Sequence, residues 1–359
     1  MKNLYCTIMA GGTGTRFWPR SKSSRPKQYL NLFGDKSLLQ STIGRFEGMT
    51  EKENIFIVSN QSQTQILESQ TLGIPLQNHI YEPVGKNTLP CIGLAAMIAE
   101  NQDPEGIMVV SPSDHMIGDT DSFQETVMSA VAIASTSDGI VTIGIRPEYA
   151  ATGYGYVQVG KELPGSNEIR SFRVERFVEK PDLATADNYL KQGGFFWNSG
   201  MFIFKIRVFL ETVRELKPDI YAGLRKIQTA TGTPEFPDIL DANYREMENI
   251  SIDFGIMEHA KNLYLVEGDF SWNDLGSWES VYKAGKKDEN GNVSSGETLL
   301  VDTTNSYIYA DAGLISVLGL DEVIVVKEGD SILVCHRDKA EEVKKMVEIL
   351  RNKNKYHYL

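Results

Sequence analysis

The chain has 359 residues, of which 41% are hydrophobic and 23% charged, and its net charge at pH 7 is −12. This length exceeds one compact core, so we expect two domains of a soluble globular protein. No apolar stretch is long enough to cross a bilayer, and an acidic chain of this kind is not expected to bind nucleic acid. A short N-terminal apolar run without a signal-peptide pattern and three widely spaced cysteines predict a cytoplasmic protein.

The first strand-like run, Leu4 to Met9, leads into the segment Ala10-Gly11-Gly12-Thr13-Gly14-Thr15-Arg16. Glycine lets the backbone turn tightly and present N–H groups to an anion, at the edge where open α/β sheets bind ligands. The first 34 residues carry six basic and no acidic side chains, so the rest of the chain sums to −18 (−12 minus 6). This local positive charge predicts a site for a small polyphosphate. The glycine spacing matches neither a P-loop nor a NAD-dependent dehydrogenase.

Strand-like and helix-like segments alternate over the first half of the chain. This alternation predicts a Rossmann-like α/β domain, with a mostly parallel sheet flanked by helices. The predicted strands are Leu4–Met9, Ile55–Ser59, Ile107–Ser111 and Ile140–Ile145. The predicted helices are Ser37–Glu47, Gln61–Leu72, Thr88–Asn101 and Ser122–Ser135. From residue 153 to 204 the segments become longer and strand-rich, and we expect them to form a lobe on the same sheet.

A charged segment that contains Asn290-Gly291 predicts a domain boundary, with domains at 1–285 and 286–359. Short, regularly spaced strands follow the boundary and favour a small β-solenoid or sandwich. These strands are Thr298–Val301, Ser306–Tyr309, Leu314–Val317, Val323–Val326 and Ile332–Cys335. The segment from Lys339 to Asn352 has the apolar spacing of an amphipathic helix. Because so small a domain buries little core, we expect it to support a homodimer.

Several motifs together resemble those of the sugar nucleotidyltransferase family, and within it the mannose-1-phosphate guanylyltransferases (GDP-mannose pyrophosphorylases). The signature is Ala10 to Pro19 followed by Arg25-Pro26-Lys27-Gln28. The other motifs, in the family's order, are Glu82-Pro83 with Gly85-Lys86-Asn87-Thr88, Pro112-Ser113-Asp114-His115, Phe177 to Pro181, Trp197 to Phe202, Ser251-Ile252-Asp253 and Trp272 to Trp278. The resemblance covers residues 1 to 285 and is weaker beyond. Ser113 stands where the family usually has alanine, and this exchange of small residues should not remove the chemistry.

The resemblance implies a fold of the nucleotide-diphospho-sugar transferase type, with a left-handed β-helix-like C-terminal domain. The implied reaction transfers GMP from GTP to mannose-1-phosphate, giving GDP-mannose and pyrophosphate, with Mg²⁺ as cofactor. A phosphate monoester is already an anion near pH 7, so it needs no strong general base. Positioning and positive charge must therefore carry catalysis, and we expect no nucleophilic side chain.

The implied catalytic residues are Arg16, Lys27, Asp114, Lys180 and Asp274. Arg16 and Lys27 would hold the triphosphate and the departing pyrophosphate, with the backbone of Gly11, Gly12, Thr13, Gly14 and Thr15 around it. Asp114 and Asp274 would bind Mg²⁺, which takes few protein ligands and completes its shell with water and phosphate oxygens. A lone aspartate is more often a turn or cap residue, and here the motif context favours the metal. For His115 we expect a structural role rather than metal ligation.

The two organic parts of the product are assigned to different residues. Lys180 would meet the sugar phosphate, Glu179 and Asn198 the sugar hydroxyl groups, and Gly155 would let the backbone approach the ring. The implied base-side residues are Glu82, Pro83, Gly85, Asn87 and Thr88. Guanine presents two adjacent donors that one carboxylate can accept, which favours Glu82. Recognition by backbone atoms of residues 83 to 88 is the alternative.

Three questions stay open at this stage. The sugar could be another one, such as a heptose-1-phosphate, because the motifs separate these substrates poorly. A non-catalytic sensor that binds a sugar nucleotide is a further alternative, although all five implied catalytic residues are present. Asp253 precedes the helix-like run Phe254–Ala260, and an N-cap role and a site role are equally compatible with that position.

Overall fold

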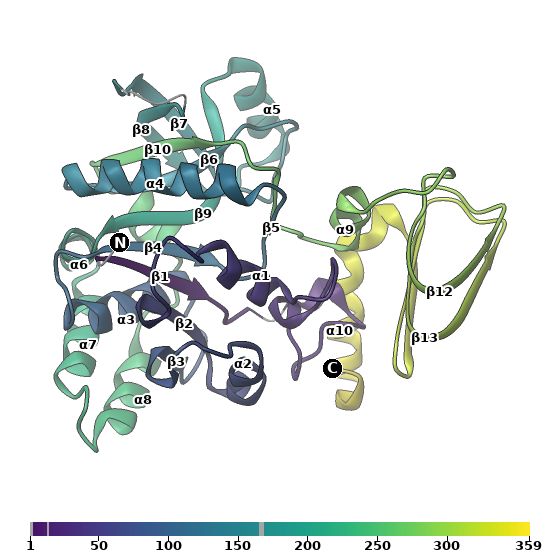
Figure 1. Cartoon of the computed structure of the whole chain (residues 1–359), viewed down its shortest axis with the longest axis horizontal. Helices are drawn as coiled ribbons and strands as arrows, with labels where there is room; N and C mark the ends of the chain where they lie inside the picture. The colour runs from purple at the N-terminus through teal and green to yellow at the C-terminus, as the bar shows by residue number, and fades with distance from the viewer. Residues whose placement is uncertain (1–2, 13, 165–168) are drawn as a thin grey trace.

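The computed structural model describes residues 3–12, 14–164 and 169–359. Its main body is a nine-stranded sheet with helices on both faces (Figure 1). In spatial order the strands are β3 (His79–Glu82), β2 (Ile55–Asn60), β1 (Leu4–Met9), β4 (Ile107–Pro112), β9 (Phe195–Lys205), β6 (Ile140–Ile145), β10 (Leu263–Gly268), β8 (Ser171–Val178) and β7 (Tyr156–Glu162). The pairings make seven strands point one way and β8 and β9 the other. The predicted mostly parallel α/β class is confirmed.

The helices lie where the alternation predicts them in the first half of the chain, with ends shifted by a few residues. They are α1 (Leu38–Arg45), α2 (Thr64–Gln70), α3 (Thr88–Glu100), α4 (Thr120–Thr136), α5 (Leu183–Gln192), α6 (Ile206–Leu216), α7 (Pro218–Thr229), α8 (Phe236–Glu246) and α9 (Trp278–Ala284). Helix α2 is shorter than predicted because residues 61–63 form a separate 3-10 turn. Helices α5 to α9 were not predicted, and α5 interrupts the strand-rich region that was expected from residue 153 to 204. None of the helices in the described ranges could span a membrane.

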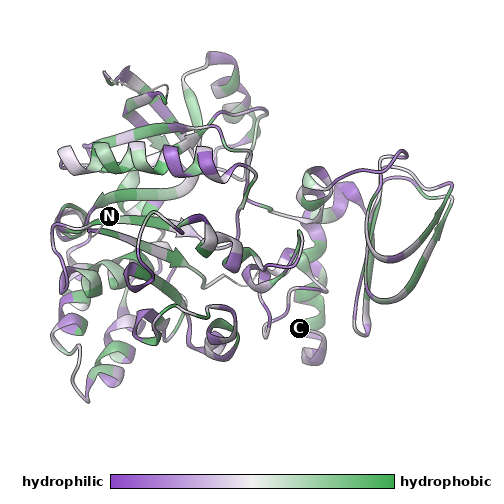
Figure 2. Ribbon diagram, in the orientation of Figure 1, coloured by the Kyte–Doolittle hydropathy of each residue, from purple (hydrophilic) through white to green (hydrophobic). Residues whose placement is uncertain are grey.

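The central strand β1 contributes to two separate hydrophobic cores. Tyr5 packs with residues of α3, α6 and α7 on one face, whereas Cys6 and Ile8 pack with residues of α1 and α4 on the other. Successive side chains of a strand point to opposite faces, so a strand that is apolar throughout lies in the middle of the layers. Figure 2 shows hydrophobic colouring along the central strands, whereas the helices around them carry both hydrophobic and hydrophilic residues.

The carboxyl ends of β1, β3 and β4 meet at one edge of the sheet. Met9 pairs with Pro112 in the parallel register, and the Ser113 N–H donates to the Met9 carbonyl oxygen at 3.2 Å. A small antiparallel ribbon adds a second constraint at this edge, formed by β5 (Met116–Ile117) and β11 (Trp272–Asn273). This ribbon brings the residues around position 274 beside those around position 114.

Residues 293–336 form a second, four-stranded sheet. Strands β12 (Val293–Val301), β13 (Tyr307–Leu318) and β14 (Val323–Glu328) pair in parallel, and β15 (Ser331–His336) is antiparallel to β14. Consecutive parallel strands joined by short turns are the rungs of a β-helix, so the predicted β-helix-like unit is confirmed. The strands predicted at 306–309 and 314–317 are both parts of β13. The boundary after residue 285 and the left-handed twist of the unit stay predictions.

The C-terminal helix α10 (Val343–Asn352) returns from the β-helix to the main body (Figure 1). Val343 and Val347 are buried in a third core, together with Phe17 from the segment after the glycine loop and Trp278 from α9. The apolar side of the amphipathic helix predicted for residues 339–352 therefore packs in one core with residues from the N-terminal part of the chain.

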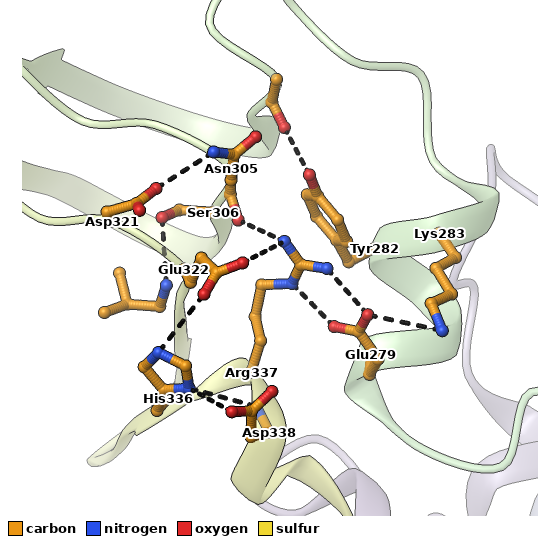
Figure 3. A network of polar contacts seen from close by, with 12 residues as sticks. Glu279, Tyr282, Lys283, Asn305, Ser306, Asp321, Glu322, His336, Arg337 and Asp338 are labelled. Atoms are coloured by element: carbon orange, nitrogen blue, oxygen red, sulfur yellow. Dashed lines mark hydrogen bonds and ion pairs between the residues drawn. The ribbon is translucent and has the colours of Figure 1, made fainter.

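A polar network reinforces this junction (Figure 3). Arg337, at the start of the 3-10 turn before α10, donates to both carboxylate oxygens of Glu279 on α9 at 2.7 and 2.8 Å. Its guanidinium carbon lies 3.7 Å from the centre of the Tyr282 ring, and it also donates to the Asn305 carbonyl oxygen at 3.0 Å. The β-helix, α9 and the C-terminal segment are thus held by one arginine.

Candidate active site

Two adjoining cavities open at the carboxyl edge of the main sheet. The central cavity, of about 420 Å³, lies between the glycine loop, the start of α3 and the ends of β8 and β9. The side cavity, of about 330 Å³, lies between the glycine loop and α10. Asp114, His115 and Asp274 line both cavities. These three residues therefore stand where the two cavities meet.

The glycine loop runs along both cavities. Gly11 and Gly12 line the central cavity, and Gly14 and Thr15 line the side cavity. Thr13, which the sequence also predicted to bind nucleotide, lies outside the described residues. The loop accordingly spans from one cavity to the other, as expected of a backbone cradle for a chain of phosphates.

Two side chains from the second half of the signature motif shape this loop. Gly14 has a φ of +60°, and a Cβ atom there would lie 2.3 Å from the Cβ of Lys27, so a larger residue cannot occupy the position. The Gln28 amide donates to the carbonyl oxygens of Ala10 and Gly12 at 2.5 and 3.1 Å. The role of Gln28 was not predicted.

Glu82 forms the floor of the central cavity beside the glycine loop. It is 4% exposed, and its Oε2 atom is 3.0 Å from where a Cβ on Gly11 would lie. Its Oε1 atom accepts a hydrogen bond from the Tyr244 hydroxyl group. Burial raises the pKa of Glu82 to about 7, against the effect of this hydrogen bond. A carboxyl group that is buried at the end of a cavity, with one oxygen toward the cavity, is suited to reading a polar edge of a ligand.

The start of α3 provides the wall next to Glu82. Gly85, Asn87 and Thr88 line the central cavity, whereas Pro83 does not. Asn87 has a φ of +68°, and its side chain accepts a hydrogen bond from the Thr88 N–H at 2.9 Å, so it caps the helix. Of the predicted base-side residues, all but Pro83 are therefore brought to one end of the central cavity.

The side cavity gathers three cationic side chains: Arg16, Lys27 and Lys344. Lys27 is 5% exposed. Its Nζ atom lies 2.9 Å from Asp114 Oδ2 and 2.6 Å from the Asp274 backbone oxygen. Arg16 is more exposed, and its Nε atom forms an ion pair of 3.1 Å with Glu341 in the turn before α10. This density of positive charge suits a polyanion.

The two predicted metal ligands meet at the junction of the cavities, although 160 residues separate them in the chain. Asp274 Oδ1 accepts a hydrogen bond from the Tyr154 hydroxyl group at 2.8 Å. Burial alone would raise the pKa of Asp114, but the charges of Lys27 and His115 outweigh it, so this pKa lies below its usual range. The Asp114 carboxylate is thus held by a cation, whereas the Asp274 carboxylate is held by a neutral hydroxyl group.

This donor set fits a hard divalent cation with a partly solvent-filled shell. Asp114 and Asp274 offer carboxylate oxygens only, and Mg²⁺ is commonly bound by one or two carboxylates with water and phosphate oxygens. In the ranges that the structure describes, no group of three or more His, Cys, Asp or Glu side chains could hold a metal ion. The geometry fits a metal ion whose coordination shell is completed by phosphate oxygens of the substrate.

The contacts of His115 are compatible with the structural role that was predicted for it. The Trp272 indole N–H donates to His115 Nδ1 at 3.1 Å, and the two rings meet edge to face. Burial lowers the pKa of His115, against the opposing effect of the Asp114 charge. Through Trp272, this histidine fixes the strand that leads to Asp274.

The predicted sugar-side residues lie together at the opposite end of the central cavity from Glu82. Gly155, Glu179, Lys180 and Asn198 all line it. A Cβ atom on Gly155 would be 2.6 Å from Glu179 Oε2, so a larger residue there would displace the end of the Glu179 side chain. Lys180 Nζ donates to Glu179 Oε1 at 2.5 Å, and Lys180 has a φ of +43°. This strained backbone directs a cation toward the cavity next to a carboxylate.

Asp253 belongs to the same end of the cavity. The Asn198 amide donates to Asp253 Oδ1 at 2.9 Å, and the Asn198 oxygen accepts from Thr142 Oγ1 at 2.9 Å. Burial, reinforced by the nearby Glu179 carboxylate, raises the pKa of Asp253 to about 6. Asp253 is the first residue of a short π-helical turn, and the residue at the N-cap position is Ile252. The contacts therefore favour a site role over the N-cap role.

The residues that were missed share one property. Tyr154, Tyr244 and Trp272 contact residues that are distant in the chain, and Lys344 lines the side cavity with such residues. A tyrosine or lysine in such positions carries no local signal, and Tyr244 lies 162 residues from its partner Glu82. Their roles follow from the tertiary structure alone.

Comparisons with known proteins agree with this geometry. A family model described as nucleotidyl transferase matches residues 6–291, and a model described as a MannoseP isomerase/GMP-like beta-helix domain matches residues 296–350. A crystal structure from Thermus thermophilus, described as mannose-1-phosphate geranyltransferase, has a TM-score of 0.88 and 32% identity, and the match covers 97% of this chain and 99% of that one.

Two curated relatives cover nearly the whole chain. The mannose-1-phosphate guanylyltransferase of Escherichia coli K12 is 36% identical over 99% of this chain and 75% of its own length. The xanthan biosynthesis protein XanB of Xanthomonas campestris is 37% identical over 98% of this chain and 74% of its own length. The chain therefore belongs to the nucleotidyl transferase family, in the branch of the mannose-1-phosphate guanylyltransferases.

Proposed function

We propose that this enzyme transfers GMP from GTP to mannose-1-phosphate, giving GDP-mannose and pyrophosphate. The observation that carries the proposal is the meeting of the two cavities at Asp114 and Asp274. The central cavity has a base-side end at Glu82 and a sugar-side end at Glu179, which matches the two ends of a sugar nucleotide. The cationic side cavity matches the pyrophosphate that leaves. The α-phosphorus would then lie at the junction.

The residues at the junction suit attack by a phosphate oxygen. Lys180 would hold the phosphate of mannose-1-phosphate, whose oxygen forms the new bond to the α-phosphorus. The bond from that phosphorus to the bridging oxygen breaks, and pyrophosphate departs toward Arg16 and Lys27. Because the nucleophile is already anionic, no side chain needs to remove a proton. Fixed cations at the departing group supply most of the stabilisation.

Enzymes of this family generally use a divalent metal ion, and we propose Mg²⁺ here. Asp114 and Asp274 would hold it. The bound ion supplies positive charge to the phosphate oxygens at the junction. Without the ion, Lys27 pairs with the Asp114 carboxylate and donates to the Asp274 backbone oxygen, so this cation lies beside the metal ligands and close to the phosphates.

Guanine is the base that best suits the floor of the central cavity. Its ring N1–H and exocyclic amine are adjacent donors, and the ionised Glu82 carboxylate can accept from both. A site built around a buried polar group strongly rejects a ligand that leaves the group unpaired. GTP should therefore be preferred over ATP and UTP, and ITP, which lacks the amine, should be a poorer substrate.

The function is tested by pyrophosphate release with the purified protein and Mg²⁺. The panel combines GTP, ATP, UTP and ITP with mannose-1-phosphate, glucose-1-phosphate and a heptose-1-phosphate. The highest kcat/KM is expected for GTP with mannose-1-phosphate. A higher value for a heptose-1-phosphate would move the assignment to another sugar, and no release with any pair would favour the non-catalytic alternative.

We further propose a cytoplasmic homodimer that pairs through the β-helix unit. The thiols of Cys6, Cys91 and Cys335 are free, which suits a reducing compartment. On the β-helix, Val301 and Leu318 are register partners on neighbouring strands and both are exposed. Exposed apolar patches of this kind mark interaction surfaces. Leu318→Asp should convert the dimer into a monomer by light scattering, and an unchanged dimer would contradict this interface.

A further inference from the structure

We propose that Lys344 of the C-terminal helix binds the leaving pyrophosphate, as a third cation beside Arg16 and Lys27. This inference rests on the proposed function, because it assigns the side cavity to the terminal phosphates of the triphosphate. It makes the β-helix domain a contributor to the chemistry of the site. No motif of the first 285 residues could have pointed to it.

Helix α10 is fixed against the segment that carries Arg16. It packs on the 3-10 turn Thr15–Phe17, which directly follows the glycine loop. Val343 and Val347 are 3% and 5% exposed and share a core with Phe17. In addition, the Trp18 indole donates to the Tyr358 carbonyl oxygen at 2.9 Å. Lys344 directly follows the buried Val343, and Arg16 directly precedes Phe17. The core that Val343 and Phe17 share therefore holds Lys344 and Arg16 at the same cavity.

Lys344 differs from the other lysines of this segment in what surrounds it. Lys339 and Lys345 both form ion pairs with Glu342, at 2.9 and 2.7 Å. Lys344 has no ion-pair partner within the described residues, and it lines the side cavity with Arg16 and Lys27. A lysine without a counter-ion, at a cavity that already holds two cations, is stabilised when an anion enters.

Arg16, which lines this cavity, already has an anionic partner. Glu341 pairs with Arg16 at 3.1 Å, and both side chains are largely exposed. Exposed pairs of this kind are weak, so a polyphosphate can replace Glu341 as the partner of Arg16 at little cost. Once Glu341 is displaced, three cations face the phosphates. The ligand class is thus a diphosphate or the β- and γ-phosphates of a nucleoside triphosphate.

The test compares Lys344→Met with Lys345→Met in the full chain. Both changes remove one charge from the exposed side of α10, but only Lys344 lines the cavity. Loss of one charge-assisted contact should raise the KM for GTP about tenfold, and the KM for pyrophosphate in the reverse reaction equally. The KM values for mannose-1-phosphate and GDP-mannose should stay within about twofold. Lys345→Met should behave as the unmodified enzyme.

Calorimetric titration with inorganic pyrophosphate separates this proposal from the proposed function. Lys344→Met should weaken pyrophosphate binding about tenfold while Lys345→Met leaves it unchanged, whichever sugar phosphate the enzyme uses. Lys344→Arg should restore most of the affinity. Equal affinities of Lys344→Met and the unmodified protein would overturn the assignment of Lys344. Equal Tm values of the variants would confirm that the comparison concerns folded protein.

Discussion

Lys27 and Asp114 form a partly buried ion pair of 2.9 Å between the glycine-loop motif and the residues that follow β4. The same ammonium contacts the backbone of Asp274. Three motifs that lie far apart in the chain are therefore joined at one atom. Any change at this point should affect turnover much more than folding, because each partner retains other contacts.

Asp274→Asn should reduce turnover by about 100-fold or more, because the metal loses one of its two carboxylates. The amide oxygen of asparagine can still accept from Tyr154, so the fold should persist. Tyr154→Phe is the matched control, since it removes this hydrogen bond and keeps the carboxylate. The measurements are Mg²⁺-dependent pyrophosphate release and Tm. Unaltered Mg²⁺-dependent activity in Asp274→Asn would refute the metal assignment.

GTP use should increase with pH because Glu82 must ionise to accept two donors from guanine. In the free enzyme its pKa is about 7, so kcat/KM for GTP should fall about tenfold per pH unit well below pH 7. The GTP phosphates also titrate. Their contribution is removed when the pH profile of kcat/KM for the unmodified enzyme is divided by the same profile for Glu82→Gln. Glu82→Gln should also narrow the preference for GTP over ITP. If this ratio did not change with pH, Glu82 would not be a residue that binds the base.

The same pKa predicts an effect on stability in the ligand-free protein. A carboxyl group with a raised folded-state pKa stabilises the protein below its unfolded pKa, and this contribution is lost as pH rises through about 7. The Tm should therefore fall more steeply between pH 5 and pH 8 in the unmodified protein than in Glu82→Gln. Parallel Tm curves for the two proteins would show that Glu82 is already ionised in the fold.

Lys180 and Arg16 should affect different substrates. Lys180→Ala should mainly raise the KM for mannose-1-phosphate, whereas Arg16→Ala should mainly raise the KM for GTP and lower kcat. Lys191→Ala is a control, because Lys191 is exposed and pairs with Asp187 away from the cavities. If Lys180→Ala used mannose-1-phosphate like the unmodified enzyme, the sugar-side assignment would be wrong.

Glu341→Gln should lower the KM for GTP by up to about fivefold, since it removes a competitor for Arg16 worth less than about 1 kcal/mol. Glu348→Gln, an exposed change on α10, should have no effect. The comparison is made by steady-state kinetics at low ionic strength, where exposed pairs are strongest. A higher KM in Glu341→Gln would instead mean that Glu341 positions Arg16 for the substrate.

The sequence predicted the parts of the site that depend on local pattern. Apolar runs such as Ile107–Ser111 become β4, and glycines such as Gly14 occupy positions where only glycine fits. It did not predict how Asp274 reaches Asp114, because the ribbon of β5 and β11 has only two residues in each strand. Strands so short have no detectable periodicity.

The same limit applies to contacts that side chains make across the fold. The hydrogen bond from Tyr244 to Glu82 depends on the position of α8, and α6 to α8 were not predicted. The sequence does not indicate that Lys344 lines a cavity, since most lysines are exposed and face only water. Tertiary placement is decided by packing of whole elements, which no local segment encodes.

The core that Phe17 shares with Val343 has a consequence for synthesis on the ribosome. The nine-stranded sheet can form once residue 268 has emerged, but the wall of the side cavity needs α10 and the contact between Trp18 and Tyr358. Contacts between such distant segments form late and slow the final folding step. A nascent chain would thus have its base-side end in place before the third cation of the side cavity, so partly made protein should bind pyrophosphate more weakly than the finished chain.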